Sequence, residues 1–254
     1  MGIHIIVNKI YLVTKEDNLI IKELSYLFNI NIIDTIPDNY SDCYLEFYNN
    51  KLWIKHNNLI KLNLDELYET IIKRLNRKNE LIIKANKHNN INNDKVLILD
   101  LTAGLGKDSL ILQKNNFQIT MVEYNPLLVI ILNYAKLKGY FNNSTSIIQS
   151  NSYDFFKKNY TNISPNNKIN IYLDPMFKQN KTAKPKKNMQ YIDLLTINNN
   201  ISNTDKELFD LCYNNDNISK IIIKRDNKQA EITNEFKPNY ALKSKLIRFD
   251  IYQK

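Results

Sequence analysis

The chain has 254 residues, a formal net charge of +9 at pH 7 and only two cysteines, Cys43 and Cys212. A chain of this length buries roughly 70 to 75% of its unfolded surface, so it needs neither disulfides nor a structural metal to fold. Neither cysteine has a second Cys or a His at metal-ligand spacing, which argues against a disulfide framework and a zinc site. No apolar run is long enough to cross a bilayer, and we expect a soluble cytoplasmic protein without membrane or metal partners.

The positive charge suits a polyanionic partner such as nucleic acid, because each lysine or arginine placed on a phosphate releases counterions. Asn, Ile, Lys and Tyr are abundant along the whole chain, and all four have AT-rich codons. The base composition of the gene is therefore a second explanation of the lysine excess, and charge alone leaves both open.

The first 90 residues predict a small α+β region. Short strands are expected over 43–48 and 51–55, followed by a helical stretch over 64–87. The asparagine-rich segment at 89–93 marks a boundary, so that residues 1–90 form this region and residues 91–254 a second domain.

From residue 95 onward, short apolar runs alternate with helical patterns, which is typical of βαβ units and a parallel sheet. The predicted strands are 96–100, 118–123, 146–149, 169–173, 218–224 and 245–252. The predicted helices are 107–114, 126–138, 153–158, 186–195 and 205–213. The fold class is therefore α/β, with a mostly parallel, doubly wound sheet.

Two of the four glycines, Gly104 and Gly106, follow the strand predicted at 96–100. Glycine there allows positive φ and close approach of the backbone to a ligand. The next strand ends at Glu123, where doubly wound folds place an acid that binds ribose hydroxyls. Position 109 is Ser, so the third glycine of the dinucleotide fingerprint is missing. This argues against NAD and a dehydrogenase, and favours S-adenosylmethionine, a nucleoside cofactor without a pyrophosphate.

The strand predicted at 169–173 is followed by Asp174-Pro-Met-Phe177. If this strand lies beside 96–100 where the strand order reverses, Asp174 faces the cofactor site. The tetrapeptide resembles the Asp/Asn-Pro-Pro-Tyr/Phe motif of methyltransferases that act on exocyclic amines. A carboxylate that accepts hydrogen bonds from such an amine localises its lone pair, and Phe177 can stack on the base, a contact worth about 1 to 3 kcal/mol. We predict Asp174 and Phe177 as the catalytic residues.

The order of these motifs resembles the ribosomal RNA small subunit methyltransferase J family. The resemblance covers most of residues 96–252, and Tyr172-Leu-Asp-Pro-Met-Phe177 is its most specific part. The other matching segments are 100–108, 123–126 with the helix to Gly139-Tyr140, 186–187 with Met189, 223–225 and 248–252.

The resemblance implies a class I Rossmann-like methyltransferase that transfers a methyl group from S-adenosylmethionine to N2 of a guanine in small-subunit (16S) rRNA. It implies small-subunit rRNA or the 30S subunit as the partner. A monomer is favoured, although the sequence does not fix the oligomeric state, the target nucleotide, or whether naked rRNA or an assembled subunit is the substrate.

The resemblance also implies which residues hold the cofactor, in addition to the two loop glycines. They are Lys107, Asp108, Glu123, Tyr124, Asn151, Ser152 and Asp174. Family members usually have Arg at the positions of Lys107 and Tyr124 and Ser at that of Asn151, and Lys lacks the planar fork of Arg. They also carry a glycine-rich run where 74–80 has no glycine, so the sequence leaves open whether this stretch impairs activity.

Lysines follow the Asp-Pro-Met-Phe motif directly. They are either part of a solvated loop or an electrostatic clamp on RNA phosphates beside a flipped base. Lys224 and Arg225, at the end of a later strand, are further candidates for RNA contacts. The lysines of the loop are Lys178, Lys181, Lys184, Lys186 and Lys187.

Three alternatives to this function stay open at the level of sequence. A DNA adenine or a protein glutamine amine methyltransferase would keep the fold and change the acceptor. A catalytically lapsed RNA-binding protein would keep the RNA surface alone. The third alternative is a dehydrogenase, and the missing third glycine of the dinucleotide fingerprint argues against it.

Overall fold

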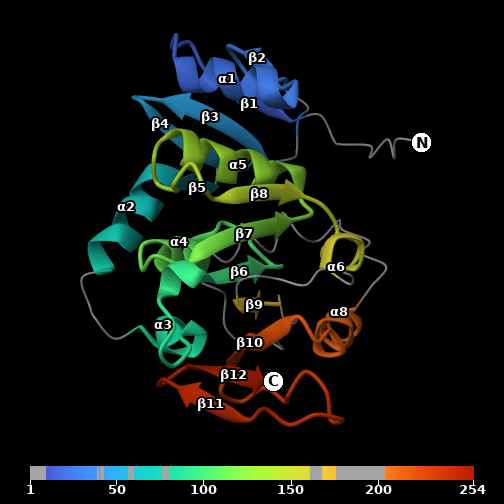
Figure 1. Cartoon of the computed structure of the whole chain (residues 1–254). Coiled ribbons are helices and arrows are strands. Elements are labelled where there is room, and N and C mark those ends of the chain that lie inside the picture. Colours follow the sequence, from blue (N-terminus) through green and yellow to red (C-terminus); the bar gives the residue numbers. More distant parts are fainter. Residues whose placement is uncertain are drawn as a thin grey trace.

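The computed structural model describes residues 10–38, 40, 43–56, 60–75, 80–160, 168–175 and 204–254. Within these residues the strands form a five-stranded and a seven-stranded sheet. Figure 1 shows the smaller sheet at one end of the molecule and helices on both sides of the larger one. Of the helices in this part of the chain, none has the length and apolar character that crossing a bilayer requires.

The smaller sheet has the strand order β2-β1-β3-β4-β5. Its strands are β1 (Tyr11–Val13), β2 (Asn31–Ile33), β3 (Tyr44–Tyr48), β4 (Lys51–His56) and β5 (Ile60–Asn63). β1 pairs in parallel with β2 and β3, whereas β3, β4 and β5 form an antiparallel meander. Helix α1 (Leu19–Phe28) connects β1 to β2, and the Asn18 side chain caps it by accepting hydrogen bonds from the N–H groups of Ile20 and Ile21. The region thus has the predicted α+β character.

The helical stretch predicted over 64–87 consists of two helices, α2 (Leu64–Arg74) and α3 (Leu81–Asn86). Both contact α4 (Lys107–Gln113), and α3 also contacts three strands of the larger sheet. Ile82 and Ala85 of α3 are buried in the same apolar cluster as that sheet. Apolar contacts therefore cross the predicted domain boundary near residue 90, and that division of the chain stays a prediction.

The larger sheet has the order β11-β12-β10-β9-β6-β7-β8. Its strands are β6 (Val96–Asp100), β7 (Gln118–Glu123), β8 (Ser146–Gln149), β9 (Lys168–Leu173), β10 (Ile218–Asp226), β11 (Tyr240–Lys243) and β12 (Ile247–Gln253). The five strands from β10 to β8 are parallel, and β12 is antiparallel between β10 and β11. The predicted strands and the mostly parallel sheet are confirmed. β11 was not predicted, because its sequence Tyr-Ala-Leu-Lys lacks adjacent β-branched apolar residues, whereas β8 has the same burial pattern but carries two isoleucines.

Helices cover both faces of this sheet (Figure 1). One face packs against α3, α4 and α5 (Pro126–Leu137), and the other against α6 (Ser152–Tyr160) and α8 (Asp205–Tyr213). Neighbouring residues of β6 divide between the two cores, with Ile98 in the first cluster and Leu99 in the second. Strands that are buried on both faces read as continuous apolar runs, which is why the sequence pattern predicted them correctly. The helix predicted at 186–195 lies outside the described residues.

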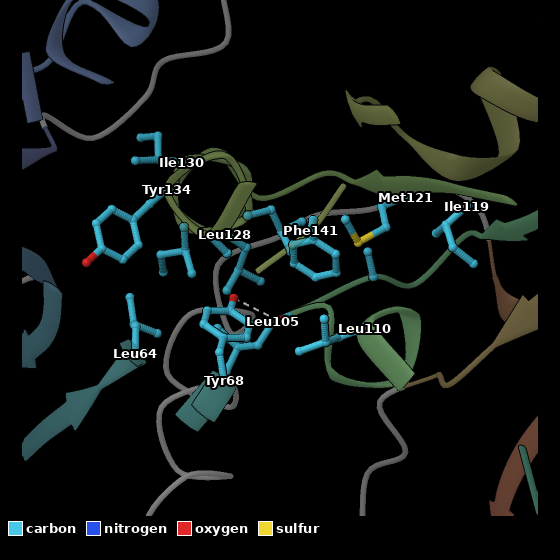
Figure 2. Close-up of a cluster of buried hydrophobic side chains, with 14 of the residues drawn as sticks. Leu64, Tyr68, Leu105, Leu110, Ile119, Met121, Leu128, Ile130, Tyr134 and Phe141 are labelled. Carbon is cyan, nitrogen blue, oxygen red and sulfur yellow. Dashed lines mark hydrogen bonds between the residues drawn. The ribbon is translucent and has the colours of Figure 1, made fainter. Parts of the chain in front are cut away.

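A cluster of buried side chains joins α2 and α5 to the loop after β6, as Figure 2 shows. The Tyr68 side chain is 0% exposed, and its hydroxyl donates a hydrogen bond of 3.0 Å to the backbone carbonyl of Leu105. Burial, together with the nearby Asp65, raises the pKa of Tyr68 well above its ordinary value, so that the hydroxyl stays a donor. Helix α2 thereby fixes one peptide of the glycine loop.

The buried carboxylate of Asp65 connects the smaller sheet to α5. It accepts hydrogen bonds from the Leu52 N–H at 2.9 Å, the Tyr134 hydroxyl at 2.7 Å and the Tyr140 hydroxyl at 3.0 Å, and the Lys138 ammonium lies 3.4 Å away. The side chain of Asp65 is 3% exposed, so these partners take the place of nearly all of its water. Burying such a carboxylate costs free energy, and removing it from its partners strongly destabilises the fold.

We expect Asp65→Ala to lower the free energy of unfolding by about 3 kcal/mol, because a backbone N–H and two hydroxyls would lose their shared acceptor. Urea denaturation followed by circular dichroism measures this loss. Asp154→Ala is the control, since Asp154 is likewise a first-turn acid but is exposed on α6, and a change there should stay within about 0.5 kcal/mol. Equal losses in the two variants would contradict the prediction.

Candidate active site

The loops that follow β6 and β9 meet at the carboxyl edge of the larger sheet. These two strands are parallel neighbours, and the strand order reverses between them. The Leu101 N–H donates to the Tyr172 carbonyl at 3.1 Å, and the Asp174 N–H donates to the Thr102 hydroxyl oxygen at 2.7 Å. The predicted pairing of the two strands is therefore confirmed. Open α/β sheets bind their ligands at this position.

Asp100, the last residue of β6, holds the start of the glycine loop. One of its carboxylate oxygens accepts a hydrogen bond of 2.6 Å from the Ser109 hydroxyl, and the other accepts one of 3.2 Å from the Thr102 N–H. Burial raises the pKa of Asp100 to about 7, although both hydrogen bonds oppose this shift. The serine in place of the third fingerprint glycine thus has a role inside the fold: it ties α4 to β6.

Glu123 and Gly104, predicted as cofactor residues, are in direct contact. The Glu123 carboxylate accepts hydrogen bonds of 2.8 Å from the Gly104 N–H and, with its other oxygen, from the Asn125 N–H. Burial raises the pKa of Glu123, and hydrogen bonds from the backbone, including the Tyr124 N–H, oppose the rise. The residue is partly exposed, and with three backbone N–H donors the carboxylate keeps about one of its roughly four lone-pair sites for a ligand hydroxyl. Tyr124 follows it as a partly exposed side chain.

The two loop glycines differ in their surroundings. Gly104 has φ +55°, and a Cβ built there would have only the Thr102 carbonyl oxygen within 4 Å, at 3.9 Å, so that side of the loop is open. Gly106 has φ +67°, and its Cβ would lie 2.7 Å from Leu132 and 2.9 Å from Phe141. The missing side chain at 106 therefore lets the loop pack against α5, whereas Gly104 leaves room for a ligand.

Asn151 and Ser152 lie after β8, at the start of α6. The Asn151 side-chain oxygen accepts hydrogen bonds from the N–H groups of Tyr153 and Asp154, which is a helix N-cap. The Ser152 hydroxyl donates to the Leu101 carbonyl at 2.5 Å, so it holds this turn against the end of β6. The structure brings both residues to the same edge of the sheet as the glycine loop, where both side chains have structural partners.

Two acidic side chains from different loops share one lysine. The Lys224 ammonium at the end of β10 lies 2.6 Å from Asp108 of α4 and 2.8 Å from Asp174. Asp108 also accepts a hydrogen bond of 2.5 Å from the Tyr172 hydroxyl. Lys107 interacts with the same acids, and burial lowers the pKa of Lys107 although Asp108 opposes this shift. Lys107, Asp108 and Asp174, all predicted for the cofactor, are thus brought together.

Burial raises the pKa of Asp108, but the Lys224 charge and the hydrogen bonds of Lys224 and Tyr172 outweigh it and lower this pKa below its usual value. Burial also raises the pKa of Asp174; Lys224 opposes that rise, the charge of Asp108 adds to it, and the net direction is upward. Burial lowers the pKa of Lys224, yet the two carboxylates outweigh burial and raise it well above the ordinary value. The two carboxylates therefore favour the charged form of this lysine.

The residues predicted to contact RNA have different positions. Lys224 lies in the acidic cluster just described. Arg225 is 7% exposed and donates a hydrogen bond of 2.5 Å to the Ala230 carbonyl, which places its guanidinium inside the fold rather than at the surface. Phe177 and the five lysines from 178 to 187 lie outside the described residues, so their predicted roles stay predictions.

Sequence reasoning missed the two residues that connect the loops. Thr102 accepts the hydrogen bond from Asp174, and Tyr172 donates to Asp108. Both lie inside segments that the family resemblance had singled out, which was the available signal. Their roles depend on which strands are neighbours, and spacing along the chain does not show this. No group of three or more His, Cys, Asp or Glu side chains that could hold a metal occurs among the residues with described positions.

A parallel sheet whose order reverses beside a glycine loop, with an acid after the second strand, defines a Rossmann-like nucleoside-binding fold. The fold as a whole is similar to the crystal structure of the SAM-dependent methyltransferase NGO1261 from Neisseria gonorrhoeae, with a TM-score of 0.61, 18% sequence identity and 96% of each chain covered. At that identity the likeness shows the fold alone.

Residues 34–254 match the model of the family SAM_MT, described as "Putative SAM-dependent methyltransferase". The chain is 31% identical over 219 residues to the ribosomal RNA small subunit methyltransferase J of Acinetobacter baylyi, covering 79% of this chain and 77% of that protein. It is 29% identical over 222 residues to the protein of the same name from Francisella tularensis subsp. novicida, covering 83% and 87%. The chain therefore belongs to the SAM-dependent methyltransferase family that contains these J-type enzymes, and its cofactor is S-adenosylmethionine.

We expect Gly106→Ala to lower the free energy of unfolding by about 2 to 4 kcal/mol, because the new methyl group would meet α5 and the residue would keep an unfavourable positive φ. Gly139→Ala is the matched control: Gly139 has φ +79° but no atom within 4 Å of a built Cβ, so only backbone strain of about 1 to 2 kcal/mol is expected. Thermal unfolding of both variants measures the difference. Indistinguishable losses would show that packing against α5 is unimportant.

Proposed function

We propose that this protein transfers a methyl group from S-adenosylmethionine to the exocyclic N2 amine of a guanine in small-subunit rRNA. The position of Asp174 carries the proposal, because its carboxylate lies beside the glycine loop and its N–H is bonded to Thr102 of that loop. The names of the J-type relatives support small-subunit rRNA as the acceptor. The Asp-Pro-Met-Phe motif, which resembles that of amine methyltransferases, supports an exocyclic amine.

The described residues fit this cofactor. The Glu123 carboxylate retains lone-pair capacity for a ribose hydroxyl, next to the open side of Gly104. Asp108 and Asp174 offer carboxylates for the cationic methionine part of the cofactor, and Lys107 lies among them. We propose Gly106, Tyr124, Asn151 and Ser152 as supports of this site rather than as its main contacts.

The reaction requires a protein group that accepts a hydrogen bond and a proton from the amine, rather than a protein nucleophile. When bound, S-adenosylmethionine supplies an electrophilic methyl group on its sulfonium. The amino group of guanine is a poor nucleophile, since its lone pair is delocalised into the ring. The ionised Asp174 carboxylate would accept a hydrogen bond from that amine, orient its lone pair and take up the proton that it loses. Fixing the amine in this way accounts for most of the expected acceleration, through alignment and electrostatics.

We expect Asp174→Ala to reduce methyl transfer to rRNA by about 10² to 10⁴, the range observed when acid-base or electrostatic groups are lost. The assay follows labelled methyl groups from S-adenosylmethionine into rRNA, with circular dichroism as the check on folding. Asp216→Ala is the control, since the Asp216 side chain is fully exposed in the turn before β10. A folded Asp174→Ala protein with unchanged turnover would remove this carboxylate from the mechanism.

The acceptor itself is tested by mass spectrometry of small-subunit rRNA from cells with and without the protein. We expect one guanine to lose an N2-methyl group when the protein is absent. Parallel assays with DNA and with protein acceptors separate the competing amine methyltransferases. Methylation of adenine in DNA or of glutamine in protein, with none in rRNA, would overturn the proposal.

A further inference from the structure

Lys224 has the position of a residue that organises the site. Its side chain is 24% exposed, and its ammonium lies within 2.6 and 2.8 Å of carboxylate oxygens of Asp108 and Asp174. Asp108 is in the first turn of α4, after the glycine loop, whereas Asp174 follows β9. β10 pairs in parallel with β9, with Ile223 opposite Leu173, so Lys224 emerges beside Asp174 at the same edge.

This position is poorly suited to a phosphate contact. The ammonium has three N–H donors, and two of them are directed to carboxylates. A phosphate at the third donor would stand close to two negative groups, and a third acid, Asp100, interacts with both of them. An incoming phosphate would therefore meet repulsion that a lysine on an open surface would not impose.

We propose that Lys224 is a positioning residue of the methyl-transfer site, whose ammonium joins the carboxylates of the cofactor side and of the base side, and that it is not a contact to RNA phosphates. This inference rests on the proposed function in one respect, the role of Asp174 toward the amine. The geometry of the ion pairs stands independently of that role.

Without Lys224, burial and mutual repulsion would favour protonation of one of the two acids. A protonated Asp174 would offer a hydrogen where the amine needs an acceptor. The groups that face Asp174 come from four elements: Lys224 from β10, Asp108 and Lys107 from α4, Asp100 from β6 and Tyr172 from β9. Of these, Lys224 and Lys107 are the cations, and Lys224 is the one paired with the carboxylate at 2.8 Å.

The sign of the pH effect follows. Asp174 acts when ionised, so turnover is present above its pKa and is lost as the pH falls through it. Lys224 opposes the rise in the pKa of Asp174, and its removal raises this pKa further. Lys224→Met should therefore move the acid limb of the kcat profile to higher pH by about 1 to 3 units. Lys224→Arg, which keeps the charge, should leave the limb near its wild-type position.

Lys220→Met is the matched control. Lys220 lies four residues earlier on β10, on the same face of the strand, and its ammonium donates to the Lys87 carbonyl instead of to an acid. We expect this variant to keep the wild-type pH profile, whatever its stability. A shift as large as that of Lys224→Met would show that any lysine lost from this strand has the same effect, and would overturn the proposal.

Binding of rRNA separates the two roles of Lys224. For a positioning residue, Lys224→Met should leave the affinity for rRNA and its salt dependence unchanged. For a phosphate contact, the slope of log affinity against log salt should decrease by about one ion. Such a decrease, together with an unchanged pH profile, would show that Lys224 contacts RNA phosphates and would overturn its role as a positioning residue.

A titration without RNA keeps the inference separate from the proposed function. Carboxyl ¹³C shifts of labelled aspartate are followed against pH in wild type, Lys224→Met and Asp108→Asn, with Asp174→Asn to assign the signal. We expect the titration midpoint of Asp174 to rise in Lys224→Met. In Asp108→Asn it should fall, because Lys224 then has Asp174 as its only ionised partner. Unchanged midpoints would overturn the inference. If the midpoints shift but the enzyme does not methylate rRNA, the inference about Lys224 is retained and only rRNA as the methyl acceptor is rejected.

Discussion

The parallel pairing of β6 with β9 is the constraint on which the site depends. Because these strands are neighbours at the reversal of strand order, residues more than seventy positions apart meet at one edge, as the bond from Asp174 to Thr102 shows. The pairing is itself secured by apolar burial on both faces, with Ile98 and Leu99 divided between two cores. The chemistry of the edge is thus a consequence of how the strands are buried.

Burial also explains why so much charge gathers there. A carboxylate taken from water costs several kcal/mol unless other groups replace its solvent. In this protein other groups take the place of water around each acid at this edge. Asp100 accepts from a hydroxyl and a backbone N–H, and Glu123 accepts from backbone N–H groups. Asp108 and Asp174 share one lysine. The result is a preorganised arrangement of negative groups suited to a cationic cofactor.

The sequence revealed the parts of this design that depend on local pattern. Apolar runs marked the strands of the larger sheet, and two clustered glycines in a glycine-poor chain marked the loop after β6. It did not reveal β11, whose sequence has no adjacent β-branched residues, or the short parallel strand β1, which is three residues long. From the sequence, Lys224 was interpreted as a cation that contacts RNA. Its partners lie in α4 and in the loop after β9, and the local sequence pattern does not show which residues of different elements are paired. Tyr68 escaped notice for the same reason, since its partner Leu105 is thirty-seven residues away.

Helix α5 has one further consequence. Eight of its twelve residues are buried, and it packs against α1 on one side and against β7 and β8 on the other. An amphipathic helix could stay folded with one partner, whereas a helix buried on most sides loses part of its core if either partner leaves. The two sheets should therefore melt together as a single cooperative unit, and the amino-terminal part should not be removable as an accessory module.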